Sequence, residues 1–87
     1  MEFLCRLGEA LRERRLKLGM SQEGLAQCSG VHRTYISDLE RGTRNVTVLT
    51  LARIAECLDV PVSRLVKKAD PNERNGRAIR PKNKVRK

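Results

Sequence analysis

Aromatic residues and long apolar runs are scarce in this 87-residue sequence. It has no Trp, one Tyr and one Phe, so aliphatic side chains must form most of any core. No apolar run is longer than a few residues, which excludes a membrane-spanning segment. The N-terminus, MEFLCRLGEALRERR, also lacks the long apolar region of a signal peptide. We therefore expect one small folded domain that has no contact with a membrane and stays in the cytoplasm.

The chain has few residues that hold metals or carry out catalysis. Cys5, Cys28 and Cys57 are odd in number, widely spaced and without a C-x-x-C pair. This pattern argues against a metal site or a disulfide framework, and we expect reduced, buried thiols. There is one histidine, His32, and neither a carboxylate cluster with ligand spacing nor a glycine-rich phosphate loop. We expect neither an enzyme nor a bound cofactor or metal.

Positive charge is unevenly distributed along the chain. The formal net charge is +9, and nine Lys or Arg face only Asp70 and Glu73 from Lys67 onward. The apolar pattern stops after Ala69, where Pro, Gly and basic residues follow. We expect a folded domain over residues 1–68 and a basic, disordered tail over residues 69–87. Such a tail favours a polyanionic partner, although it could also serve only as a solvated tail.

Apolar residues spaced three and four apart predict a chain of short helices without strands. We expect the first helix from Phe3 to Leu18 and a second one capped by Ser21. A third helix should run from His32 to Arg41, and a fourth, capped by Thr47, should end near Cys57. The fifth opens at Val60-Pro61. The inner sides of the last two helices should carry Val48, Leu51, Ile54, Ala55, Leu58, Val62, Leu65 and Val66.

The segment from Ser21 to Gly42 predicts two helices joined by a tight turn. Gly30 lies at the turn, where positive φ is favoured, and Ala26 is small where the two helices cross. Ile36 and Leu39 follow at helical spacing on the inside of the corner. This register is the helix-turn-helix arrangement, in which the second helix enters the DNA major groove.

Arg15 lies on the inward stripe of the first predicted helix, among Leu7, Leu11 and Leu18. A buried guanidinium needs a partner, and Glu40 at the end of the third helix is the obvious candidate. The alternative is a solvated Arg15 at the edge of the helix.

Three motifs, LRERRLKLGMSQEGLA, GVHRTYISDLERG and TLARIAECLDV, resemble the Cro and lambda-repressor-like (Xre-type) DNA-binding family. The match covers roughly Leu7 to Val66, and RTYISDLERGTRN is similar to restriction–modification controller proteins. The resemblance implies an all-α, compact five-helix lambda-repressor-like domain with a helix-turn-helix. It also implies a homodimer on a near-palindromic operator. Ser29 and Leu49 depart from the family pattern.

The resemblance implies that the third helix carries the residues that contact base edges: Arg33, Thr34 and Asp38, flanked by Ser37. Arg33 can donate two hydrogen bonds to guanine, or it can bind a phosphate instead. Asp38 can accept from cytosine N4, or it can orient Arg33. Tyr35 can bind a phosphate or pack beside the turn.

Other polar residues are expected along the DNA backbone. Gln22 begins the second helix, where backbone N–H groups and the helix dipole favour a phosphate. Arg44 lies in the following loop, which the resemblance places along the backbone or in the minor groove. The full expected set is Gln22, His32, Tyr35, Arg41, Thr43 and Arg44.

Leu49 has no intramolecular explanation, since it points away from the apolar side of the fourth helix. We expect it to contact a second copy of the chain together with the fifth helix, through Val62 and Leu65. The alternative is a singly exposed Leu, which is common on protein surfaces.

These features predict a sequence-specific transcriptional regulator that binds double-stranded DNA in the nucleoid. It could act as a repressor, or as an activator that touches RNA polymerase. The alternative is an antitoxin that binds a partner protein as well as DNA, although the tail is poor in the apolar residues that such binding needs.

Overall fold

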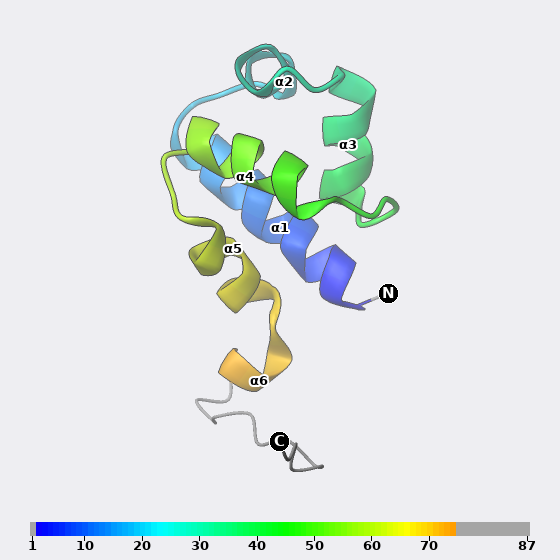
Figure 1. Ribbon diagram of the computed structural model, residues 1–87, viewed down its shortest axis with the longest axis vertical. Helices are drawn as coiled ribbons and strands as arrows, with labels where there is room; N and C mark the ends of the chain where they lie inside the picture. The colour runs from blue at the N-terminus through cyan, green and yellow to red at the C-terminus, as the bar shows by residue number, and fades with distance from the viewer. Residues whose placement is uncertain (1, 75–87) are drawn as a thin grey trace, which may run out of the picture.

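The computed structural model describes residues 2–74 and contains helices but no strand in that range. The first five helices confirm the expected all-α class (Figure 1). A short sixth helix follows them. Their bounds are α1 Glu2–Lys17, α2 Gln22–Ser29, α3 Arg33–Arg41, α4 Val48–Cys57, α5 Val62–Ala69 and α6 Pro71–Arg74.

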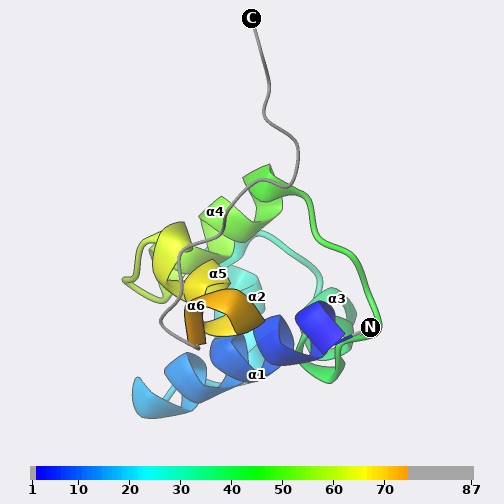
Figure 2. The same ribbon diagram turned by 90° about the horizontal axis from the view of Figure 1, so that it is seen from below.

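Helix α1 is the longest element and the one around which the others are arranged. It packs against α3 and α5, while α2 packs against α3 and α4. Figure 2 shows α1 running along one side of the domain, with α4, α5 and α6 above it and α3 beside its N-terminal end. The enclosed core is aliphatic, as the scarcity of aromatic residues requires. It consists of Leu7, Ala10, Leu11, Leu25, Ala26, Ile36, Leu39, Leu51, Ile54, Ala55, Leu58, Val60, Leu65 and Ala69.

Side-chain caps and left-handed glycines set the ends of the two helices in the corner. The Ser21 hydroxyl accepts a hydrogen bond from the Gly24 N–H at 2.9 Å and so starts α2. Gly30 ends α2 with φ of 74° and donates its N–H to Ala26 O. Helix α3 then begins two residues beyond Val31 and ends at Gly42, with φ of 77°. The turn therefore fixes the angle between α2 and α3.

Two apolar residues that we expected in the core are exposed instead. Leu18 follows the end of α1, and Val48 lies in the first turn of α4. The helical period gives the direction in which a side chain points but not whether another element covers it.

Within residues 2–74, no helix is long and apolar enough to cross a membrane.

The expected start of the tail, Ala69, is fully buried at the end of α5. Helix α6 follows it directly and contacts α5. The remainder of the expected tail, residues 75–87, lies outside the described residues.

The expectation of three reduced, buried cysteines is wrong. Cys28 and Cys57 form a disulfide, and Cys5 is an exposed free thiol. Cys28 lies near the end of α2 and Cys57 at the end of α4. Because these two helices pack together, their ends approach to 6.0 Å between Cα atoms, within the range that a disulfide spans. Distance along the sequence gave no indication of this pairing.

Candidate nucleic-acid interface

Helix α3 presents a polar outer face, while Ile36 and Leu39 hold its inner face in the core. Arg33 and Thr34 lie exposed in its first turn. Among residues 2–74, neither side chain makes a hydrogen bond or ion pair, so their donors are available to a ligand. Arg33 and Thr34, which we expect to contact base edges, are therefore exposed side by side in the first turn of α3.

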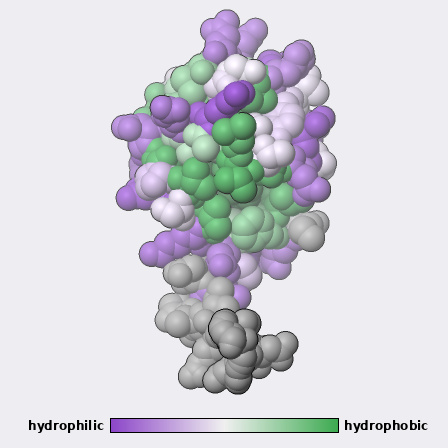
Figure 3. All heavy atoms as spheres, in the orientation of Figure 1, coloured by the Kyte–Doolittle hydropathy of each residue, from purple (hydrophilic) through white to green (hydrophobic). Residues whose placement is uncertain are grey.

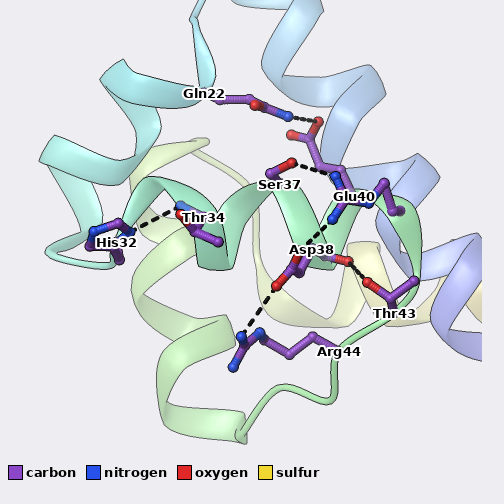
Figure 4. A network of polar contacts seen from close by, with 9 residues as sticks. Gln22, His32, Thr34, Ser37, Asp38, Glu40, Thr43 and Arg44 are labelled. Carbon is purple, nitrogen blue, oxygen red and sulfur yellow. Dashed lines mark hydrogen bonds and ion pairs between the residues drawn. The ribbon is translucent and has the colours of Figure 1, made fainter.

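His32 has a local structural role that the sequence did not predict. Its Nδ1 accepts a hydrogen bond from the Thr34 N–H at 3.1 Å, which makes His32 the N-cap of α3. Figure 4 shows this contact at the start of the helix. An imidazole that accepts at Nδ1 can donate at Nε2, and this is the nitrogen that is able to reach a phosphate.

A buried polar cluster lies on one side of α3 and connects it to α1 and α2. Arg15 donates from Nε to Glu40 Oε2 at 2.7 Å and from Nη2 to Oε1 at 3.0 Å. A third donor, Nη1, reaches Met20 O at 2.7 Å. The hydrogen bonds and the charge of Glu40 raise the pKa of Arg15, against the opposing effect of burial. Both side chains are nearly fully buried, so the pair fixes α3 against α1.

Gln22 extends this cluster to the start of α2. Its Nε2 donates to Glu40 Oε1 at 3.1 Å (Figure 4). One amide N–H is used in this bond, and the second can still donate outward. Gln22 is thus held at the helix N-terminus, where we expect a phosphate.

An exposed cluster centred on Asp38 lies on another side of α3 and extends into the following loop. Its Oδ1 meets Arg41 Nη2 at 2.5 Å and its Oδ2 meets Arg44 Nη2 at 3.2 Å. Arg41 also donates to the Ser37 hydroxyl at 3.0 Å. Asp38 therefore pairs with Arg41 and Arg44, and the expected alternative in which it orients Arg33 is wrong. An i,i+3 partner and a loop partner both lie nearer to it than the helix start.

Tyr35 is half-buried and packs against the core. Its hydroxyl donates to Asn45 O at 3.3 Å, and the Arg44 guanidinium carbon lies 4.7 Å from its ring centroid. Thr43 Oγ1 donates to Asp38 O at 3.2 Å. The loop after α3 is thus attached to the helix by contacts from three consecutive residues.

Sequence reasoning missed Gly8, which permits the close approach of α1 to α3. A Cβ at this position would lie 2.3 Å from Leu39 O and 2.7 Å from Glu40 O, both backbone atoms. A side chain here would therefore push α3 away. A glycine in the interior of a predicted helix, where it is unfavourable, was the available signal.

Figure 3 shows an apolar area on the face that carries α4 and α5. The expected dimer residue Leu49 lies in α4 and is exposed. Leu49 is 66% exposed and its neighbour Val48 is 78% exposed, while Val62 is half-buried. Leu65 is buried in the core, so its predicted contact with a second copy is wrong. It points toward α1 because α5 packs there.

No group of three or more His, Cys, Asp or Glu residues within residues 2–74 is arranged to hold a metal ion. The polar side chains that gather around α3 are mainly hydrogen-bond donors. Such a surface suits an anionic ligand.

Comparison with known proteins agrees with this geometry. The helix-turn-helix family matches residues 11–65. Control protein C.SmaI from Serratia marcescens is 47% identical over 60 residues, which cover 69% of this chain and 71% of that protein.

Two solved structures superpose with a TM-score of 0.70 each. The restriction-modification controller protein C.AhdI from Aeromonas hydrophila is 42% identical, with 71% of this chain and 94% of that one covered. The controller protein C.Esp1396I was solved as a tetramer in complex with its natural 35 base-pair operator. It is 36% identical, with 79% of this chain and 96% of that one covered.

Proposed function

The chain belongs to the helix-turn-helix family of DNA-binding transcriptional regulators, and we propose that it binds a near-palindromic operator as a homodimer. Restriction–modification controller proteins are prominent among its relatives, so we propose a role of that kind in regulating transcription. The observation that carries this proposal is the pair of exposed donors Arg33 and Thr34 in the first turn of α3, whose side chains have no partner among residues 2–74. The protein would act in the cytoplasm, on the nucleoid.

We assign base reading to Arg33, Thr34 and Ser37. The Arg33 fork matches guanine O6 and N7, and Thr34 offers a hydroxyl to a base edge and a methyl group to thymine. Contacts with phosphates would come from the N-terminus of α2, the start of α3 and the loop after it. The residues concerned are Gln22, His32, Arg41, Thr43 and Arg44. Tyr35 stays beside the loop as a packing residue.

Selection of bound sequences from random DNA tests this assignment directly. A two-fold symmetric consensus is expected, since a dimer presents two recognition helices about 34 Å apart, one turn of B-DNA. Arg33→Ala should relax the preference at one guanine per half-site, worth about 1–3 kcal/mol. Absence of any enriched sequence would overturn the proposed function.

The dimer contact is proposed around Val48, Leu49 and Val62. Val48 and Leu49 are adjacent, strongly exposed aliphatic side chains in the first turn of α4, and together they form an apolar area larger than a single exposed Leu. A second copy applied to this area would bury it and give the two-fold symmetry that a palindrome requires.

Leu49→Glu tests the dimer by placing a charge in the proposed contact. Sedimentation at micromolar concentration should shift from dimer toward monomer. Leu16→Glu is the matched control, because Leu16 is half-exposed on α1 and lies outside the proposed contact. An unchanged sedimentation profile for Leu49→Glu would contradict the contact.

The basic segment after α5 is proposed to add phosphate contacts without sequence preference. After Ala69, seven Lys or Arg stand against two acids. Removing residues 75–87 should flatten the dependence of DNA affinity on salt and leave the consensus unchanged. A changed consensus would contradict this division of roles.

A further inference from the structure

The Asp38 carboxylate has both of its oxygens occupied. Arg41 takes Oδ1 and Arg44 takes Oδ2, at 2.5 and 3.2 Å. The Asp38 side chain is 19% exposed, whereas those of Arg41 and Arg44 are 62% and 45% exposed. The acid thus lies beneath the two guanidinium groups, and the cluster presents positive charge outward.

This arrangement is poorly suited to reading cytosine. A carboxylate that accepts from cytosine N4 must approach the base edge with an available oxygen, close to DNA phosphates of the same charge. Here both oxygens are already paired with cations. Reading a base would add a further donor to a carboxylate that lies beneath the two more exposed guanidinium groups.

Arg44 is held from a second direction by Tyr35. Its guanidinium carbon lies 4.7 Å from the ring centroid, and the ring itself is anchored by packing and by its hydrogen bond to Asn45 O. The backbone on the other side of Arg44 is fixed as well, because the Thr43 N–H donates to Asp38 O at 3.0 Å. Figure 4 shows Arg44 extended alongside α3 toward Asp38.

The geometry points to Asp38 as a positioning residue for DNA binding rather than a base reader. Its carboxylate and the Tyr35 ring hold Arg44 beside the recognition helix, so that the guanidinium is oriented before DNA arrives. A long side chain that is already ordered loses less conformational entropy on binding. This inference rests on the proposed function, since it concerns how the same interface engages DNA.

The sign of the Asp38→Asn effect separates positioning from simple electrostatics. Removing a negative charge next to DNA should by itself strengthen binding. If Asp38 positions Arg44, affinity for the selected operator should instead fall, by about three-fold, the size expected for losing an exposed pair. Glu56→Gln is the matched control, because Glu56 is an exposed acid on α4, away from α3. It should bind no more weakly than the parent protein.

A double-mutant cycle identifies Arg44 as the group through which Asp38 acts. Operator affinity is measured at one fixed salt concentration for the parent, Asp38→Asn, Arg44→Gln and the double variant. Arg44→Gln should lose about ten-fold, since a phosphate or base contact disappears. In the Arg44→Gln background, Asp38→Asn should no longer weaken binding, because the guanidinium that Asp38 positions is absent. Asp38→Glu, which can still reach the guanidinium, should recover part of the affinity.

Sequence selection with Asp38→Asn provides the decisive outcome. An unchanged consensus together with weaker binding supports positioning. A new preference at one base pair that persists in the Arg44→Gln background would show that Asp38 reads that base, and would overturn the inference. Tighter or equal binding by Asp38→Asn would also overturn it. Failure of the parent protein to enrich any sequence would instead refute the proposed function itself.

Discussion

Two acidic residues of α3, only two positions apart, form ion pairs of opposite character. Glu40 is nearly fully buried and joins α3 to α1 and α2 through Arg15 and Gln22. Asp38 lies near the surface and joins α3 to its own following loop through Arg44. The difference teaches that one helix uses the same chemistry twice, once to fix its orientation in the domain and once to arrange the groups that it presents.

The largest expected effect comes from breaking the buried pair. Glu40→Ala leaves the Arg15 guanidinium buried without its counter-charge and should lower the free energy of unfolding by about 3–5 kcal/mol. Urea denaturation monitored by circular dichroism measures this loss. A loss no greater than that of Asp38→Ala would contradict the comparison.

A double replacement, Arg15→Met with Glu40→Leu, is the control for this prediction. Most of the lost stability should return, since apolar side chains of similar volume tolerate burial well. Operator affinity should stay reduced, because the bidentate contact that sets the angle of α3 is absent. Full affinity in this variant would show that packing alone orients the helix.

Removing the disulfide tests whether the stability of the chain around α3 depends on a covalent constraint in addition to the buried Arg15–Glu40 pair. Cys28 and Cys57 are 29 residues apart and enclose α3 with both of its acids. Replacing both by Ser should cost about 3–4 kcal/mol under oxidising conditions, from the entropy of the unfolded chain. The consensus should not change, since Arg15 and Glu40 still orient α3. In reductant, the parent and the variant should converge in stability.

Gly8→Ala tests whether the close backbone contact between α1 and α3, next to the buried Glu40 pair, contributes to stability. The added methyl group would meet Leu39 O and Glu40 O, so α1 and α3 must separate. We expect a loss of about 1–3 kcal/mol in the free energy of unfolding, typical of overpacking. Gly24→Ala in α2 is the control, because its Cβ would meet only side-chain atoms, the nearer at 3.2 Å. A neutral Gly8→Ala would show that the two helices can shift without cost.

The smallest expected effect on stability is that of Asp38→Ala. Its arginine partners remain solvated when the acid is removed, so the loss should be no more than about 1 kcal/mol. Thermal unfolding should therefore hardly change, although DNA affinity falls. A loss as large as that of Glu40→Ala would erase the distinction between the two clusters.

Much of this fold follows from local signals in the sequence. Ser21, Gly30 and Thr47 mark helix ends that the structure confirms, because capping depends on residues within one turn. The pairing of Arg15 with Glu40 was inferable because a charge on an apolar stripe needs a partner. Each of these signals is a local requirement, a capped helix end or a partner for a buried charge, that can be recognised without knowing the fold.

The features that escaped prediction depend on where separate elements meet. The disulfide requires the ends of α2 and α4 to lie side by side, and the exposure of Val48 requires knowing that nothing covers the first turn of α4. Asp38 had several cations within reach along the chain, and only the path of the loop selects Arg44. In each case the neighbouring sequence is compatible with several arrangements, and only the packing of distant elements decides between them.

The Cys28–Cys57 bond turns the segment from α2 to α4 into a closed ring that carries the recognition helix. A single cut after Arg44, in the exposed loop of that ring, would divide the backbone into two pieces. The oxidised protein would nevertheless remain one covalent molecule, with α3 still attached to α4 through the two sulfur atoms. Proteolytic nicking would therefore release two fragments only after reduction.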